Sequence, residues 1–239
     1  QWARGGFLGV DVFFVLSGFL ITLLLLGELR STGHLELARF WGRRVRRLFP
    51  ALILLVLGVC LYAAFAATPD QLHAIRIDGI ASLLYVQNWR LIASGQSYFA
   101  QFGVPSPFRH VWSLAIEEQW YLLWPLALIG LVRLVRGNLH RLAVITVALA
   151  AGSAAWMAVL YDPADPSRVY YGTDTRAFAL LLGSSLGMVW LRHPGPQSAV
   201  ARWSVQAVGV VAGAYLVWTV HVRTALSASL YRGGLAMVA

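Results

Sequence analysis

Long apolar runs constrain this chain more than any other feature of its sequence. Most of them approach the roughly 20 residues that an α-helix needs to cross the hydrocarbon core of a bilayer. The runs cover residues 7–26, 50–67, 111–132, 142–160, 174–191, 203–220 and 231–239. The sequence therefore predicts an all-α fold, a polytopic transmembrane helical bundle.

The distribution of charge supports this class and argues against a nucleic-acid partner. Hydrophobic residues make up 59% of the chain and charged residues 12%, whereas about a quarter of the residues in soluble domains are charged. The net charge of +9 comes from arginines that cluster beside the apolar runs. Basic clusters of this kind usually mark membrane topology, so we expect the lipid bilayer as partner and no nucleic acid.

The loops alternate between basic and acidic. Arginines cluster in 30–47 and 133–141, while the intervening connections carry Asp70, Asp162 and Asp165. By the positive-inside bias, residues 28–49 are expected to form a basic cytoplasmic connector. Residues 68–110 are expected to form an extracytoplasmic segment with a short or re-entrant helix. The prediction is a multi-pass protein of the plasma (inner) membrane.

The ends of the chain bear on its domain organisation. Residues 1–239 read as one membrane domain, but the chain opens on Gln1 rather than Met, and the run 231–239 stops at the final residue. We therefore expect a partial domain. The single cysteine, Cys60, permits no disulfide within the chain, and no metal-binding motif is present.

The stretch from His110 to Pro125 holds the strongest candidate site. At helical spacing one face collects a base, a carboxylate and aromatic rings: His110, Ser113, Glu117, Trp120, Tyr121 and Trp124. Carboxylates near hydrocarbon cost about 2.5–3.5 kcal/mol on insertion scales, so Glu117 and Glu118 indicate a functional site. The alternative is a water-facing helix start, where acidic side chains suit the helix dipole.

Two other charged residues lie at apolar helix ends. Asp11 is the one acid in the first apolar run. It either has a direct role or serves as an interfacial cap or a partner for an arginine of a neighbouring helix. Arg176, near the start of a later helix, is placed to pair with Glu117, Glu118 or Asp11.

The basic segment contains two overlapping Arg-x-x-Arg pairs. Arg43 and Arg46 form one pair and Arg44 and Arg47 the other, each on one helical face. Such pairs suit a phosphorylated donor, because the guanidinium group makes bidentate bonds to phosphate. Topology marking and contact with anionic headgroups, at about 1 kcal/mol per basic residue, explain the segment equally well.

Other sequence patterns do not indicate a catalytic site. Ser113 lacks the Gly-x-Ser-x-Gly context of a nucleophile elbow. The spacing of His73 and Asp78 matches one acyltransferase block by coincidence. The patterns Gly183-x3-Gly187 and Gly209-x3-Gly213 predict close helix packing.

Three stretches, in this order and spacing, resemble the acyltransferase 3 family of integral-membrane O-acyltransferases. They are 6–22, 43–51 and 110–125, of which Trp112-Ser113-Leu114-Ala115-Ile116-Glu117-Glu118-Gln119-Trp120-Tyr121-Leu122 is the most specific. Trp120 stands where the family commonly has Phe. Residues 174–183 are similar to a weaker family block, so the resemblance spans nearly the whole chain.

The resemblance implies a larger membrane bundle that moves an acyl group, commonly acetyl from coenzyme A, onto hydroxyls of surface glycans or lipids. It implies that the donor is met by Arg43, Arg44, Arg46 and Arg47. Glu117 and Asp11 would be catalytic, with one of them orienting the family's histidine, and both would lie toward the acceptor together with Arg176. Around them, His110, Trp112, Ser113, Glu118 and Tyr121 would shape the site, and His110 is also a candidate for proton exchange.

The family carries its catalytic histidine on the helix before the Gly5-Gly6-Phe7 stretch. We expect this sequence to lack that first helix and the C-terminal helices, so residues 1–239 would not include the general base. Acyl-CoA (acetyl-CoA) is the implied co-substrate, with no bound cofactor, and protein partners stay open. Transfer is either direct or through an acyl-enzyme. The alternatives to an enzyme are a proton- or ion-coupled secondary transporter and a non-catalytic scaffold.

Overall fold

The computed structural model describes residues 6–98, 105–193, 195, 198–222 and 229–235. Its elements follow one another as η1 (Gly6–Leu8), α1 (Gly9–Thr32), α2 (Leu37–Phe65), α3 (Pro69–Leu83), α4 (Gln87–Ala93), α5 (Val111–Leu134), α6 (Leu139–Leu160), α7 (Ser167–Tyr171), α8 (Thr173–Arg192), α9 (Ala199–Val222) and the π-helix η2 (Leu230–Gly234). Within these ranges there is no strand, and the all-α prediction is confirmed.

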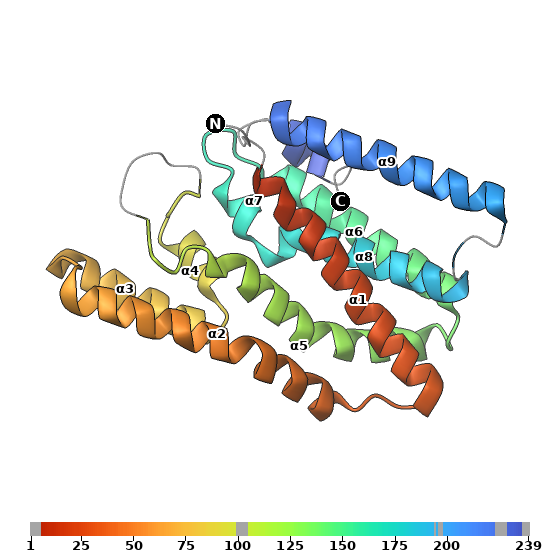
Figure 1. Ribbon diagram of the computed structural model, residues 1–239, viewed down its shortest axis with the longest axis horizontal. Coiled ribbons are helices and arrows are strands. Elements are labelled where there is room, and N and C mark those ends of the chain that lie inside the picture. The colour runs from red at the N-terminus through yellow and green to blue at the C-terminus, as the bar shows by residue number, and fades with distance from the viewer. Residues whose placement is uncertain (1–5, 99–104, 194, 196–197, 223–228, 236–239) are drawn as a thin grey trace.

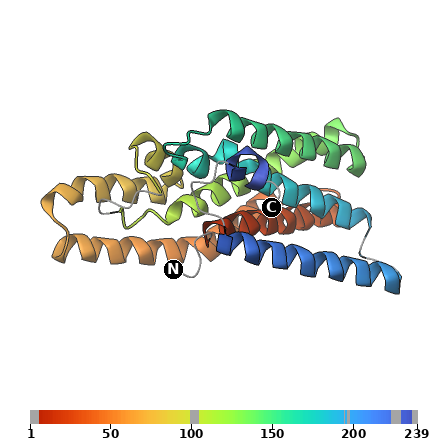
Figure 2. The ribbon, with the colours of Figure 1, turned by 90° about the horizontal axis from the view of Figure 1, so that it is seen from above.

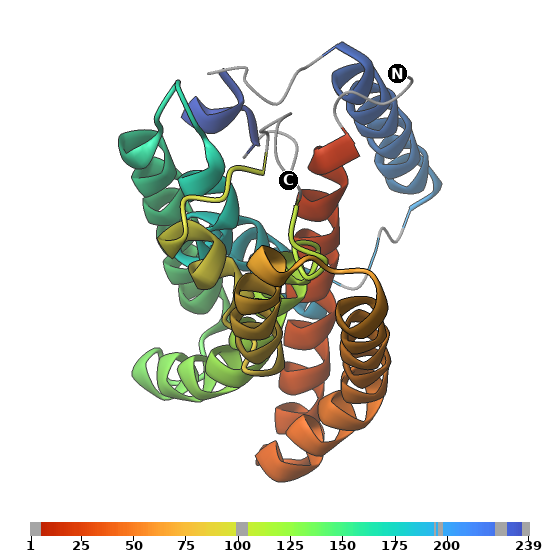
Figure 3. The ribbon, with the colours of Figure 1, turned by 90° about the vertical axis from the view of Figure 1, so that its left-hand side faces the viewer.

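The long helices lie side by side (Figure 1). Helix α1 packs along α8 and also contacts α5, while α6 covers another side of α8. Helices α2 and α3 form a hairpin that extends beyond the rest of the bundle (Figures 1 and 2). Helix α9 stands at the edge of the bundle (Figure 3).

Helix α1 has an inward face and an outward face. Its buried residues recur at helical spacing: Asp11, Phe14, Ser17, Gly18, Ile21, Thr22, Leu25 and Leu26. Phe13, Leu16 and Leu20 are more than half exposed on the other side. An apolar outer surface combined with buried polar groups is the pattern expected of a helix between lipid and a bundle interior.

The contact between α1 and α8 depends on glycine. A Cβ at Gly18 would overlap the carbonyl oxygen of Leu180, and a Cβ at Gly183 would overlap that of Val15. A Cβ at Gly187 would lie 3.0 Å from the neighbouring backbone of α1. The close packing predicted for Gly183-x3-Gly187 is confirmed.

Among the described residues, four helices are long and apolar enough to cross a membrane: α1, α2, α6 and the Arg202–Val222 part of α9. The predicted spans 111–132 and 174–191 correspond to α5 and α8, which do not meet the same criteria. Both carry buried polar or charged residues, including Glu117, Arg176 and Ser184, and these residues lower the mean hydropathy of the two helices.

Most of the basic segment 28–49, predicted as a connector, is helical. Residues up to Thr32 complete α1, and Gly33 ends it with φ 78° in the left-handed region. Helix α2 then begins at Leu37 and continues through Pro50 to Phe65. Leucine, alanine and arginine are good helix formers, so the basic residues extend the apolar helix instead of interrupting it.

The described part of the segment 68–110, residues 68–98 and 105–110, contains two helices where the sequence predicts one. Thr68 starts α3 with a capping box to Gln71, and Pro69 occupies the first turn. Helix α3 turns back alongside α2 (Figures 1 and 2). Tyr85 has a positive φ of 54° and separates α3 from α4.

The last helices differ from the prediction in one contact. A Cβ at Gly209 or Gly213 would meet no atom within 4 Å, so the close packing predicted for them is wrong within the described residues. Of the predicted run 231–239, the structure describes only the part up to Leu235, most of it in η2. The remaining residues lie outside the described ranges.

Candidate active site

Glu117 is the centre of a buried hydrogen-bond network between α1 and α5. Its side chain is 5% exposed. Ser17 Oγ donates to Glu117 Oε1 over 2.6 Å, and the Tyr121 hydroxyl donates to the same oxygen. The two hydroxyl oxygens lie 2.8 Å apart. Because each hydroxyl has a single proton, donation of both to the carboxylate leaves no proton between them.

Tyr121 connects this network to the arginine segment. The Arg44 guanidinium lies over the Tyr121 ring at 4.8 Å and over the Phe40 ring at 5.5 Å. Trp41 Nε1 donates to the Tyr121 backbone oxygen over 3.0 Å. Cation–π contact and a hydrogen bond therefore hold the first turns of α2 against α5. Arg44 is consequently brought to the same level of the bundle as Glu117.

A cavity of about 380 Å³ borders Tyr121, between α2, α5 and the turn after α3. Arg44, Glu118 and Tyr85 contribute its polar groups, and its walls are otherwise mostly apolar. Glu118 Oε1 is buried and has no hydrogen-bond partner among the described residues. The cavity thus presents a cation and a carboxylate to whatever occupies it.

Tyr85 is held in an unusual conformation at this cavity. A bulky residue with positive φ is a conformational outlier. Gln119 Nε2 donates to the Tyr85 carbonyl over 2.7 Å and to Asn88 Oδ1 over 3.0 Å, which fixes the turn. Burial and, to a smaller extent, the Glu118 carboxylate raise the pKa of the Tyr85 phenol. The phenol is therefore a neutral group in the wall.

Asp11 and Arg176 form a second polar centre, between α1 and α8. Arg176 Nη1 lies 2.5 Å from Asp11 Oδ1, and both side chains are fully buried. Arg176 Nε also donates to the Tyr170 carbonyl over 3.0 Å, and the guanidinium lies 4.4 Å from the Tyr170 ring centroid. Trp112 packs against the same ring at 4.6 Å. Asp11 precedes Ser17 by six residues, or about 9 Å along a helix.

The remaining predicted site residues differ in exposure and in whether they contact the Glu117 network or its cavity. His110 is exposed at the start of α5, and no described contact joins it to Glu117. Ser113 is half-buried. Of the predicted donor-binding arginines, Arg44 is half-buried at the cavity, whereas Arg43, Arg46 and Arg47 are exposed.

Three residues of the candidate site were not identified from the sequence. Ser17, Trp41 and Gln119 make the contacts that join α1, α2 and the α3–α4 turn to α5. A signal existed for Gln119, which follows two carboxylates in an otherwise apolar helix. A single serine or tryptophan in an apolar run carries no such signal, because its partner lies on another helix.

Comparison with known proteins identifies the family of the chain. A family model described as an acyltransferase domain matches residues 1–237. The chain belongs to this acyltransferase family. It is 47% identical over its full length to peptidoglycan O-acetyltransferase OatA of Listeria monocytogenes, covering 39% of that protein. It is 42% identical, again over its full length, to a Bacillus subtilis protein with the provisional name of peptidoglycan O-acetyltransferase YrhL, covering 38% of it.

The chain thus spans about 39% of the length of the Listeria relative. No solved structure matches it. Family membership and the apolar helices together make it a multi-pass membrane protein. For this acyltransferase domain, the network around Glu117 and the adjoining cavity form the candidate active site.

Proposed function

We propose that this chain is the membrane part of an O-acyltransferase that moves an acyl group, acetyl in the first instance, from cytoplasmic acyl-CoA to a hydroxyl of an extracytoplasmic glycan. The family and the names of its relatives support the reaction class and point to peptidoglycan as the acceptor. The location that fits this role is the plasma membrane. The observation that carries the proposal is that Tyr121 contacts both residues: Arg44 lies over its ring, and its hydroxyl donates to Glu117.

Arg44 is assigned to the donor. Guanidinium groups bind phosphate through bidentate, charge-assisted hydrogen bonds, and acyl-CoA carries several phosphates. Arg44 borders the cavity beside Tyr121, and exposed Arg43 and Arg47 lie on the same stretch of α2. Phosphates held here would place the thioester arm in the cavity, where its mostly apolar walls suit a hydrocarbon chain.

The reaction requires one bond to form and one to break. The acceptor oxygen attacks the thioester carbonyl, a C–O bond forms, the C–S bond breaks, and the hydroxyl proton ends on the departing thiolate. The family resemblance assigns the proton transfer to the histidine before the Gly5-Gly6-Phe7 stretch. Glu117, fixed by Ser17 and Tyr121, is assigned to orienting this base or the hydroxyl, because a positioned carboxylate lowers the entropic barrier.

The test uses the full-length protein in a strain that lacks it. Base-labile acetyl esters are measured on isolated peptidoglycan with wild type, with Glu117→Gln and with Asp70→Asn as control. Asp70 is an exposed acid in the first turn of α3. At matched membrane levels, we expect esters with wild type and with Asp70→Asn, and a loss of at least about tenfold with Glu117→Gln.

The contrary results are equally specific. If wild type adds no esters to peptidoglycan or to other envelope glycans and lipids, the proposed function fails, and proton or ion flux in proteoliposomes then tests the transporter alternative. If wild type adds esters and Glu117→Gln does so equally well, the reaction stands and the assignment of Glu117 is wrong.

A further inference from the structure

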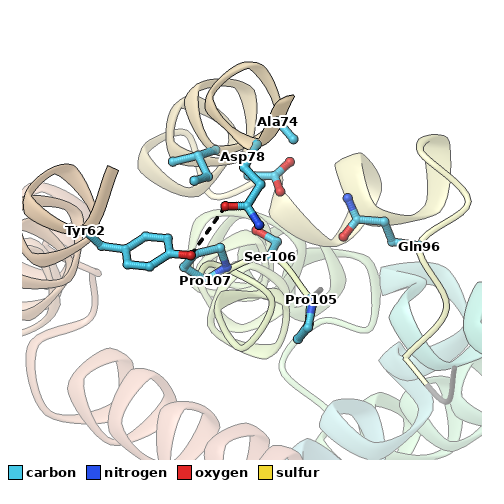
Figure 4. Close-up of a pocket in the computed structure, with 9 residues that line it drawn as sticks. Tyr62, Ala74, Asp78, Gln96, Pro105, Ser106 and Pro107 are labelled. Carbon is cyan, nitrogen blue, oxygen red and sulfur yellow. Dashed lines mark hydrogen bonds between the residues drawn. The ribbon is translucent and has the colours of Figure 1, made fainter. Parts of the chain in front are cut away.

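A second cavity, of about 80 Å³, lies outside the candidate active site, between α2, α3 and the segment that precedes α5. Figure 4 shows Tyr62 at one side of it, Asp78 above, Gln96 at the other side and Ser106 below. The volume exceeds the roughly 30 Å³ share of one water molecule in the liquid. The cavity is also open on one side, so it suits the edge of a larger molecule.

Asp78 is the unusual group in this cavity. It is fully buried, yet neither carboxylate oxygen has a hydrogen-bond partner among the described residues. Arg90 Nε lies 3.2 Å from Asp78 Oδ1 as an ion pair, without hydrogen-bond geometry. A buried acceptor without a hydrogen-bond donor is costly. A molecule that enters the cavity and donates hydrogen bonds to these oxygens would therefore be bound favourably.

The charges around this cavity indicate which kind of molecule it can bind. The Arg90 guanidinium offsets the Asp78 charge, so the site does not favour a cation. Gln96 and Ser106 add groups that both donate and accept, and the Tyr62 ring and Pro107 add apolar surface. Hydroxyl groups on a ring with apolar faces complement this combination, as in a saccharide.

Helix α3 connects this cavity to the candidate active site. Asp78 lines the small cavity, and Leu84, six residues later, lines the larger one, a separation of about 9 Å along a helix. Ser82 lies one turn after Asp78, and its buried hydroxyl lacks a hydrogen-bond partner among the described residues. Polar groups therefore continue along α3 toward the larger cavity.

We propose that the cavity at Asp78 is a saccharide subsite, which binds hydroxyl groups of a sugar unit of the acceptor at some distance from the unit that is acylated. The proposal rests on the proposed function, because it extends the acceptor site of that reaction. It predicts that the subsite contributes to binding only for acceptors long enough to occupy both the cavity at Asp78 and the candidate active site.

The experiment compares two acceptors on the purified full-length protein in nanodiscs: N-acetylglucosamine alone and its tetramer. Binding is followed by tryptophan fluorescence, and transfer by acetyl ester formed from acetyl-CoA. The variants are Asp78→Asn and Gln96→Leu, with the exposed Asp70→Asn as matched control. Gln96, at the rim, makes no described side-chain hydrogen bond, so its replacement leaves the fold intact.

With the tetramer, we expect each cavity variant to raise the dissociation constant and the acceptor KM about tenfold, with donor KM unchanged. With the monosaccharide, both variants should equal wild type. Equal losses with both acceptors would mean a structural role for Asp78, and no loss with either would mean that water alone fills the cavity. Both results overturn the subsite. Length-dependent binding that both variants weaken would leave the subsite standing even without ester formation on the tetramer, and a wild type that also adds no esters in the strain would refute the proposed function.

Discussion

Asp11 of α1 and Arg176 of α8 form an ion pair of 2.5 Å with both side chains fully buried. The pair joins two helices whose backbones already touch at Gly18 and Gly183. Removal of one partner leaves a charge in a dry interior, which costs about 3–5 kcal/mol. The pair is therefore expected to be a structural clamp between α1 and α8, placed beside the aromatic ring of Tyr170.

The first prediction separates this clamp from a chemical role. Arg176→Met should lower the folded, monodisperse fraction in detergent strongly, and Asp11→Leu combined with Arg176→Met should recover most of it, because no charge stays unpaired. Thermal unfolding of the purified protein measures the effect. Arg39→Met is the control, since the Arg39–Glu36 pair is exposed and such a pair is worth about 0.2–1 kcal/mol.

The activity of the double variant completes this test. If it folds and still forms acetyl esters, the pair is structural. A folded double variant without activity would show that Asp11 or Arg176 acts in the reaction, as the sequence allowed.

The second prediction concerns the glycine contact. Gly183→Ala should destabilise the protein by more than about 1 kcal/mol, because the new methyl group overlaps the Val15 carbonyl and the helices must separate. Gly209→Ala should be neutral or slightly stabilising, because α9 is open around that position and alanine favours helix. Retention of folded protein during heating in detergent compares the two. Equal tolerance of both substitutions would contradict the close approach of α1 and α8.

The third prediction divides the functions of Tyr121. Tyr121→Phe removes the hydroxyl that donates to Glu117 and keeps the ring beneath Arg44. We expect kcat for acetyl transfer to fall about 10- to 100-fold, with acetyl-CoA KM unchanged. Steady-state kinetics on the full-length protein provide the numbers. A rise in acetyl-CoA KM at constant kcat would place the hydroxyl in donor binding instead.

Much of this fold is accessible from the sequence, whereas the pairing of residues is not. Apolar runs of helical length predict the helices, and Gly183 with Gly187 predicts their close contact. The partner of Arg176 stayed open among Asp11, Glu117 and Glu118, because helical spacing orders residues on one helix only. Which faces meet is decided by packing between helices far apart in sequence.

The candidate site illustrates the same limit. Glu117 is conspicuous because a carboxylate in an apolar run is costly, but Ser17, which donates to it, is unremarkable in α1. The sequence predicts the basic segment as a connector that marks topology or binds a phosphorylated donor, and its contacts with another helix cannot be read from it. Arginine also favours helix, and Trp41 and Arg44 make specific contacts with Tyr121, so the segment became the first part of α2.

The fourth prediction follows from this placement of α2. Arg44 lies at the cavity beside Tyr121, whereas Arg43, its neighbour in the chain, is exposed. If Arg44 holds donor phosphate, Arg44→Ala should raise acetyl-CoA KM about 10- to 100-fold, as expected for the loss of charge-assisted hydrogen bonds. Arg43→Ala should change it by less than about threefold, because an exposed charge contributes little.

Arg44→Lys sharpens the comparison, because it keeps the positive charge and loses the bidentate geometry. Partial recovery of acetyl-CoA KM by lysine would indicate point-charge attraction, and no recovery would indicate bidentate contact. Similar KM values for Arg43→Ala and Arg44→Ala would mean that the segment acts through its overall charge on the membrane surface. In that case the donor must bind elsewhere, and the cavity at Glu118 would be left for the acceptor.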